Sequence, residues 1–462
     1  MPSAYDTSTS PAHHLAPSGT PASAQPRADR PAVLLTGPPW PRSGSARLFQ
    51  NQVDYYRSRG FSTIFLFSPV HSSFVPDHPD WPRIQEGIQE IGADHMAIAP
   101  INHARFARSK YTAWVKQGFR GTALDWVVNT GRSAEPPAEI LQLLASLSIA
   151  LVHINHVFSL GFAGQMLRRI PGAAHIPVIL ETHDIQSHLL HVRKDINPWT
   201  HRYDSVDALV RSELAHLKKV KTLLHCSVDD YKFFSAELPH NRHILALPTV
   251  DENFAAAVRN AGPALPPIDF LFVGQATDIN FSAIEWLLEK VWPLLANEAH
   301  SLKILGPLDA MVRERRPDLH ARFESHFLGA AGDLVPYYRA ARCVIAPMVS
   351  GTGISIKTIE ALGLGKPFVG TSKAYRGMPM DRIERAGLRP HDAPASFAAA
   401  MRNALASESA AAAASSAAYD DLFSKQAAFA SRDSALQAAG VAQPAAIAGG
   451  IKGEVTLHSP RP

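Results

Sequence analysis

A glycine-containing turn followed by a helix-like segment is the part of the sequence best suited to chemistry. Within residues 347–371 a short apolar run ends in Ser-Gly-Thr-Gly at residues 350–353, which we call the glycine turn, and a helical pattern follows. Glycines let a backbone approach a ligand closely, and the free amides at the start of a helix carry partial positive charge. This arrangement suits a diphosphate.

The helix after the glycine turn carries a lysine and a glutamate on one face. Gly353, Lys357 and Glu360 are spaced i, i+4 and i+7, which places them on the same side of a helix. We expect Lys357 to contact phosphate and Glu360 to accept hydrogen bonds from ribose hydroxyls. A plain helix with a solvated lysine and glutamate would show the same spacing, so both interpretations stay open.

Two more candidates follow predicted strands in the N-terminal half. Gly44 and Ser45 come after the apolar run 32–37 and open a helical segment, where backbone amides and a small side chain tolerate an anion. An ordinary turn would look the same. His183 and Asp184 end the apolar run that begins at 177. The carboxyl end of a strand is where α/β proteins bind ligands, and this position distinguishes His183 from the other histidines.

Short apolar runs alternate with helical segments along most of the chain, which predicts parallel sheets covered on both faces. The alternation pauses at the Pro- and Gly-containing residues 262–267 and then restarts. We therefore predict an α/β protein with two Rossmann-like, doubly wound domains that face a cleft. The predicted parts are a disordered tail (1–30), an N-terminal domain (31–250), a linker (251–267), a C-terminal domain (268–410), a helix (411–436) and a mobile tail (437–462).

Several sequence blocks in this order resemble glycosyltransferase family 4, whose members have the two-lobed GT-B fold. The strongest block is GTGISIKTIEALGLGKPFVGT, residues 351–371, which is similar to the family's donor-site signature. Residues 270–295, 301–307 and 333–348 resemble the preceding strand and helix units. The resemblance is good over 268–378 and weaker over 32–250.

The resemblance implies roles for individual residues. Glu360 matches the second glutamate of the family's paired-glutamate motif, which is expected to hold the donor ribose, whereas Thr352 stands where the first glutamate would be. The family's arginine and lysine after the first C-terminal strand are absent from residues 274–281, so we expect Lys357 to supply that charge. The implied donor-binding set is Gly274, Thr352, Gly353, Ile354, Lys357 and Glu360.

For the N-terminal lobe, the resemblance implies that His183 touches the donor sugar near the reacting carbon. Gly44, Ser45 and Asp184 are expected on the acceptor side. The implied reaction moves a hexose-type unit from a nucleoside diphosphate sugar to a glycan or lipid-linked acceptor in polysaccharide or glycoconjugate biosynthesis, with retention of configuration. Lys357 and helix amides would stabilise the leaving diphosphate, and no metal or other cofactor is expected.

Two alternatives stay open. A nucleotide-sugar epimerase of the same fold would use cleft carboxylates, for which Glu181 and Asp184 are candidates. A non-catalytic sugar-nucleotide-binding protein would explain the missing glutamate at Thr352. The adjacent aspartates at 229 and 230 follow Ser227 and are better explained as the capped first turn of a helix than as metal ligands.

Composition excludes some classes of protein. Lysine plus arginine is 45 and aspartate plus glutamate is 41, so the net charge of +4 argues against nucleic-acid binding. We find no signal peptide or spanning segment and expect a cytoplasmic protein with Cys226 and Cys343 as buried thiols. Basic and aromatic residues interleave over 101–121, which fits either peripheral contact with anionic lipid at the inner face of the membrane or an ordinary amphipathic helix.

Overall fold

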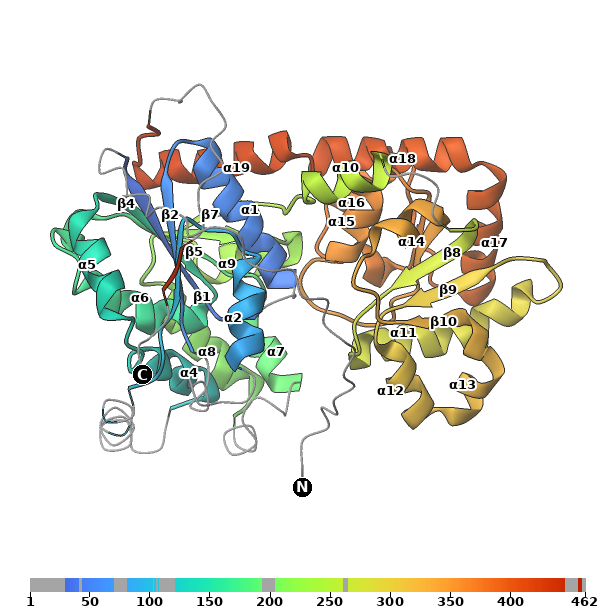
Figure 1. The fold of residues 1–462 in the computed structure, drawn as a ribbon, viewed down its shortest axis with the longest axis horizontal. Helices are drawn as coiled ribbons and strands as arrows, with labels where there is room; N and C mark the ends of the chain where they lie inside the picture. Colours follow the sequence, from blue (N-terminus) through green and yellow to red (C-terminus); the bar gives the residue numbers. More distant parts are fainter. Residues whose placement is uncertain are drawn as a thin grey trace, which may run out of the picture.

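The structure, a computed structural model, consists of two α/β lobes that lie side by side (Figure 1), each built on a parallel sheet. The described residues are 30–40, 44–69, 81–102, 104, 107, 121–192, 204–260, 265–444 and 456–458. The predicted N-terminal tail and nearly all of the segment 101–121 lie outside them.

The N-terminal sheet has the strand order β13-β3-β2-β1-β4-β5-β6-β7, and every neighbouring pair is parallel. Its strands are β1 (Ala32–Gly37), β2 (Ser62–Phe67), β3 (His95–Ile98), β4 (Ile149–Asn155), β5 (Val178–Glu181), β6 (Thr222–His225), β7 (Arg242–Leu245) and β13 (Thr456–His458). From β1 the chain continues to β2 and β3 on one side of the sheet, and from β4 it continues to β5, β6 and β7 on the other side. Such a switch point opens a crevice at the carboxyl ends of the two central strands.

Helices cover both faces of this sheet because β1 is apolar on both sides. Val33 and Leu35 join one buried cluster, and Ala32 and Leu34 join another on the opposite face. The helices are α1 (Gly44–Ser58), α2 (Trp81–Gln89), α4 (Ala123–Gly131), α5 (Ala138–Ser146), α6 (Leu160–Leu167), α7 (Gln186–Val192), α8 (Val206–Leu217) and α9 (Val228–Glu237). Ser227 caps α9 by accepting from the Asp230 amide, as its position before two aspartates predicts.

The C-terminal sheet has the order β10-β9-β8-β11-β12, again parallel throughout. Its strands are β8 (Ile268–Val273), β9 (Leu302–Leu305), β10 (Phe327–Gly329), β11 (Ala341–Ala346) and β12 (Phe368–Gly370). The order reverses between β8 and β11. The second crevice therefore lies beside the segment after β8 and the glycine turn after β11.

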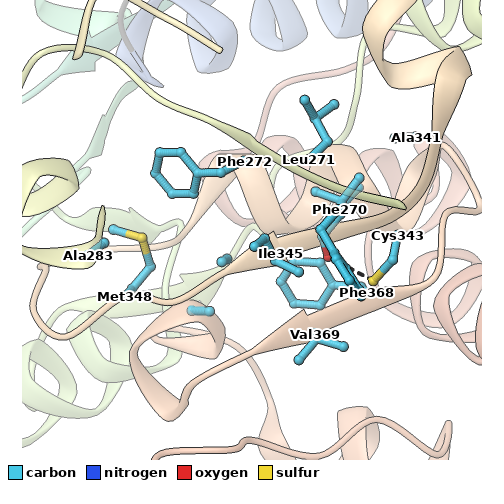
Figure 2. Packing of buried hydrophobic residues seen from close by; sticks show 14 of the residues in the cluster. Phe270, Leu271, Phe272, Ala283, Ala341, Cys343, Ile345, Met348, Phe368 and Val369 are labelled. Carbon is cyan, nitrogen blue, oxygen red and sulfur yellow. Dashed lines mark hydrogen bonds between the residues drawn. The ribbon is translucent and has the colours of Figure 1, made fainter. Parts of the chain in front are cut away.

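Side chains of three neighbouring strands form the core of the C-terminal lobe. Figure 2 shows Phe270 and Phe272 of β8 beside residues of β11 and β12. Cys343 lies in this core, and Cys226 is buried in the other lobe; both are free thiols, as expected. The surrounding helices are α10 (Glu252–Asn260), α11 (Asp278–Trp286), α12 (Leu308–Arg315), α13 (Pro317–Phe323), α14 (Val335–Ala340), α15 (Ile356–Gly363), α16 (Met380–Arg385) and α17 (Pro394–Ala406).

The end of the chain differs from the prediction of one helix and a tail. Two helices form instead, α18 (Glu408–Leu422) and α19 (Lys425–Ala439), because Ser424 interrupts the first and caps the second. In Figure 1, α18 lies over the C-terminal lobe and α19 over the N-terminal lobe. Beyond them, β13 pairs with β3 inside the stretch expected to be mobile. Part of the expected linker is helical as α10.

No helix among the described residues is long and apolar enough to cross a membrane.

Where α6 crosses α4, the packing leaves no room for a side chain at Gly161, and this can be tested. A Cβ added to Gly161 would lie 1.9 Å from the Val128 carbonyl oxygen, whereas one on Gly164 of the same helix would meet only the tip of Arg168 at 3.9 Å. We expect Gly161→Ala to lower the free energy of unfolding by about 1–3 kcal/mol, as overpacking does. Gly164→Ala should be neutral or add up to about 1 kcal/mol, because alanine favours helix. Urea denaturation measures both, and equal effects would contradict the close approach.

Candidate active site

The two crevices face each other, and the loops at their edges are in contact. Gly44, at the start of α1, lies against Ile356, since a Cβ on Gly44 would be 3.6 Å from its Cγ1. The Val228 amide at the start of α9 donates to the Gly377 carbonyl at 2.8 Å. The residues predicted from the two halves of the sequence therefore meet in one place.

The glycine turn presses against Asp184 of the opposite lobe. A Cβ on Gly353 would lie 2.2 Å from Asp184 Oδ1, and Gly353 has φ +59. Both the space and the backbone conformation thus require glycine. The Thr352 side chain hydrogen-bonds Asp184, and burial raises the pKa of Asp184 to about 7 although Arg376 and that bond oppose the shift. The Asp184 carboxyl group, whose pKa lies close to neutral pH, therefore faces the glycine turn.

Lys357 lies on the first turns of α15 and reaches back toward β8. Its Nζ donates to Asn280 Oδ1 at 2.6 Å and lies 4.7 Å from the centroid of the Phe272 ring. Burial, with Arg376 as a second cause, lowers the pKa of Lys357 to about 7. Among the described residues Lys357 forms no direct ion pair with a carboxylate, although the charge of Glu360 opposes the pKa shift, so an anion would find an amine without a direct counter-ion here.

Asn280 and Arg376 are site residues that the sequence analysis missed. Asn280 belongs to the stretch in which the family's arginine and lysine are absent; its amide nitrogen donates to the Gln275 carbonyl, which turns its oxygen toward Lys357. Arg376 donates from Nε to the Thr352 carbonyl at 2.8 Å and from Nη1 to the Lys373 carbonyl at 2.9 Å. Arg376 follows β12 without a motif, so nothing in the local sequence indicates its contact with a turn 24 residues away.

Glu360 lies one helical turn after Lys357 and is already hydrogen-bonded. The Tyr338 hydroxyl donates to it, and Arg47 of α1 is the cation that lowers its pKa most. Burial raises the pKa of Glu360 above its ordinary value, and the two cations oppose that shift. Arg47, Ile356 and Glu360 line a small pocket between the lobes.

A pair of histidines ends the two strands β4 and β5. His156 and His183 have φ angles of +61 and +64, a backbone conformation that is rare outside glycine and often marks functional sites. Their rings stack with centroids 4.0 Å apart. Burial lowers the pKa of His183 to about 4, so its ring is neutral.

His156 was not predicted, although it follows its strand as His183 follows β5. Its Nε2 lies 3.2 Å from the hydroxyl of Ser45, and Trp40 packs edge-on against its ring at 4.9 Å. The expected loop around Gly44 and Ser45 therefore contacts the histidine pair. The strand-end rule used for His183 would have identified His156.

Packing contacts hold three residues that the sequence analysis named. Gly274 lies under Phe272 and Asn280, where a Cβ would come within 3.0 Å of both. The Ile354 side chain is buried in the C-terminal core. Glu181, one of two carboxylates behind the epimerase alternative, is fully buried and paired with Arg432 rather than exposed to the cleft.

No group of three histidine, cysteine, aspartate or glutamate side chains suited to a metal ion occurs in the described part of the chain.

Comparisons with known proteins agree with this geometry. Residues 267–407 match the family model described as Glycosyl transferases group 1. The C-terminal lobe is therefore a glycosyltransferase domain. Family 4 is compatible with this match, which does not specify a family within the group. No curated protein matches the sequence.

Solved structures show the fold of both lobes. Sucrose-phosphate synthase from Thermosynechococcus elongatus is 14% identical, with a TM-score of 0.57 over 88% of this chain and 99% of its own. Anabaena Alr3699/HepE in complex with UDP is 14% identical, with a TM-score of 0.56 over 88% of this chain and 100% of its own. A trehalose-6-phosphate structure from E. coli bound with UDP-2-fluoro glucose is 12% identical, with a TM-score of 0.55 over 88% and 99%. The predicted GT-B fold is confirmed.

The charges around the glycine turn can be tested without any ligand. Arg376 lowers the pKa of both Asp184 and Lys357. We expect Arg376→Met to raise both values above about 7, since it removes an attractive charge from the carboxylate and a repulsive one from the amine. Carbon-13 spectra of the two side chains against pH measure the change. Lys373→Met is the control, because Lys373 is exposed in the same segment; an equal shift in both variants would contradict the assignment to Arg376.

Proposed function

We propose that the protein is a glycosyltransferase that binds a nucleoside diphosphate sugar between its lobes and transfers the sugar to an acceptor on the N-terminal side. The observation that carries the proposal is the placement of the glycine turn, Lys357 and Glu360 along one edge, opposite His183 and Asp184. An amine without a direct counter-ion beside a glycine turn suits a diphosphate. Two of the structural neighbours are complexes with UDP or UDP-2-fluoro glucose, which supports a uridine nucleotide as the first donor to test.

Each group would have one task. Lys357 and Arg376 would bind the diphosphate and stabilise the charge that develops on it as the bond to the sugar breaks. Glu360 would exchange its Tyr338 hydroxyl for ribose hydroxyls. His183 would contact the sugar beside the reacting carbon, and no metal takes part in this proposal.

The transfer would proceed with retention. The bond between the anomeric carbon and the diphosphate oxygen breaks, and the acceptor oxygen bonds to the same face of that carbon. The departing phosphate oxygen takes the acceptor proton, so no protein base is required. Contact between the lobes at Gly353 and Asp184 would exclude water and limit hydrolysis of the donor.

The acceptor side of the proposal is a glycan or lipid-linked molecule that approaches past Gly44, Ser45 and Asp184. Contact with the inner face of the membrane through residues 101–121 is part of the same proposal. Sedimentation with anionic vesicles tests it: a variant with the basic residues of that segment replaced should no longer co-sediment. Unchanged co-sedimentation would remove the segment from the proposal.

Donor binding and turnover test the central proposal directly. A thermal-shift series with nucleoside diphosphates and their sugars, without added metal, should give a selective shift. A ligand present at about 100 times its Kd adds about 2.7 kcal/mol. The donor that stabilises the protein is then offered with acceptors, and the configuration of the product is read by proton NMR. No shift with any donor, or an inverted product, would contradict the proposal.

Glu360 gives a donor-affinity prediction. We expect Glu360→Ala to weaken donor binding by about 1.5–3 kcal/mol, because hydrogen bonds from the ribose to a charged group are lost. Calorimetric titration measures the Kd. Glu384→Ala is the matched control, since Glu384 is an exposed glutamate of the same lobe. Tyr338→Phe removes the partner of Glu360 without touching a ligand; if it weakens binding as much as Glu360→Ala does, the effect is structural and the ribose role is wrong.

The pKa of Lys357 predicts how donor affinity depends on pH. Its pKa of about 7 in the free protein should rise when a diphosphate binds, so binding takes up a proton above that pH and affinity falls as pH rises. Asp184, whose pKa is also near 7, would act in the same direction, because its ionisation repels the diphosphate. Titrations in buffers of different ionisation enthalpy measure the uptake. In the Asp184→Asn background the remaining uptake belongs to Lys357 and should be lost when Lys357→Met is added; uptake that persists in the double variant would contradict the role of Lys357.

A further inference from the structure

A buried polar network lies beneath the histidine pair, outside the cleft, and ends on the last helix of the chain. We infer that Arg432 of α19 is a positioning residue that acts through Glu181, Gln52 and Asn155 to fix which ring nitrogen of His183 carries the proton. The inference rests on the proposed function only in that His183 acts at the donor sugar; the tautomer itself can be measured without a substrate.

The network begins with a buried ion pair. Arg432 Nη1 lies 2.8 Å from Glu181 Oε2, and Nη2 lies 3.2 Å from Oε1. The two residues are 2% and 0% exposed. Burial works against a charge on Glu181, yet Arg432 and the hydrogen bond from His153 hold its pKa well below the ordinary value. Glu181 is therefore an ionised carboxylate, which can accept hydrogen bonds but cannot donate one.

This one charge determines the orientation of two amides. The Gln52 atom 2.8 Å from Glu181 Oε2 must be the nitrogen, because a carboxylate requires a donor. Gln52 Oε1 then faces Asn155 Nδ2 at 2.9 Å, and Gln52 Nε2 faces Asn155 Oδ1 at 2.6 Å. Turning either amide over would set nitrogen against nitrogen and oxygen against oxygen.

The orientation of Asn155 determines the tautomer of His183. Asn155 Oδ1 lies 2.7 Å from His183 Nε2, and an amide oxygen only accepts. His183 Nε2 must therefore carry the proton, and Nδ1 of the neutral ring keeps its lone pair. Among the described residues, Nδ1 makes no hydrogen bond. His183 thus offers an acceptor, which suits a hydroxyl group of the donor sugar.

His156 is a natural reference, because its tautomer is not fixed in this way. Its Nδ1 lies 3.3 Å from the Gln186 amide nitrogen and its Nε2 3.2 Å from the Ser45 hydroxyl. The buried Gln186 oxygen has no partner among the described residues, so this amide can turn over, and a hydroxyl donates or accepts equally well. The two stacked histidines have similar φ angles, but hydrogen bonds determine which ring nitrogen is protonated in His183 and do not determine it in His156.

The charged and titratable groups around His183 come from four places in the fold. They are Glu181 on its own strand, Asp184 next in the chain, His153 and His156 on or after β4, and Arg432 on α19. Among these groups in the described part of the chain, only the Arg432–Glu181 pair connects to the ring through a continuous path of hydrogen bonds. The path is the physical basis of the inference.

Removing the guanidinium should reverse the tautomer. Without Arg432, the buried carboxyl of Glu181 takes up a proton and can donate to Gln52 Oε1. Both amides then turn over, and His183 Nε2 becomes the acceptor while Nδ1 carries the proton. Proton–nitrogen correlation spectra of nitrogen-15-labelled histidines measure this, with His183→Gln used to assign the signals. We expect the Nε2–H form in the native protein and the Nδ1–H form in Arg432→Met.

Two control variants distinguish the loss of the Arg432 charge from a general loss of contact between α19 and the N-terminal lobe. Arg59→Met removes another two-bonded ion pair between the N-terminal lobe and α19, that of Arg59 with Asp433, and should leave the tautomer unchanged. Arg432→Lys keeps the charge and should do the same. If Arg432→Met does not fold, Arg432→Gln provides the test, because it also removes the charge but retains a polar side chain beside Glu181.

The outcomes distinguish the inference from the proposed function. A native-like Arg432→Met or Arg432→Gln protein that retains the Nε2–H form, or a native protein in the Nδ1–H form, overturns the inference. A reversed tautomer with turnover reduced by roughly tenfold or more, as for other remote groups that orient a site residue, supports both. A reversed tautomer with unchanged turnover supports the inference and removes His183 from the proposed reaction.

Discussion

The ion pair between Arg432 and Glu181 connects α19 to β5 of the N-terminal sheet. It joins residues 251 positions apart, and both partners are buried. Breaking such a pair by removing one partner is costly, about 3–5 kcal/mol, because a charge is left without compensation in a medium of low polarity. The packing of α19, the alignment of β5 and the hydrogen bonds beneath His183 all depend on it.

Charge in the opposite lobe is arranged differently. Lys357 and Arg376 lie near the glycine turn. Glu360 of the same lobe acts on the charge of Lys357, whereas Asp184 of the other lobe acts on that of Arg376. The charge of Arg376 is thus balanced across the cleft, which makes the fit between the lobes depend on what occupies the cleft. In the proposed function, a diphosphate would supply negative charge at this place, and donor binding and lobe closure would be coupled.

The histidine pair shows how strain and rigidity occur together. His156 and His183 both hold positive φ angles, which costs roughly 1–3 kcal/mol per residue. The surrounding groups maintain this conformation: the rings stack on each other, Phe49 packs edge-on against both, and Cys226 donates to the His183 carbonyl. A rigid, neutral ring at a strand end is suited to orient a sugar rather than to exchange protons with water.

The sequence by itself determined the local elements and their class. Buried strands read as short apolar runs, Ser227 before two aspartates caps a helix, and the glycine turn before Lys357 and Glu360 resembles a donor site; each of these depends on neighbours in the chain. Only the tertiary structure brought Arg376 to Thr352, Asn280 to Lys357 and Arg432 to Glu181. These contacts join residues 24, 77 and 251 positions apart, and no local pattern encodes them because the partners lie on different elements. The break between α18 and α19 follows from local capping by Ser424, but the position of α19 was decided by packing, which sets Arg432 against a strand of the N-terminal lobe.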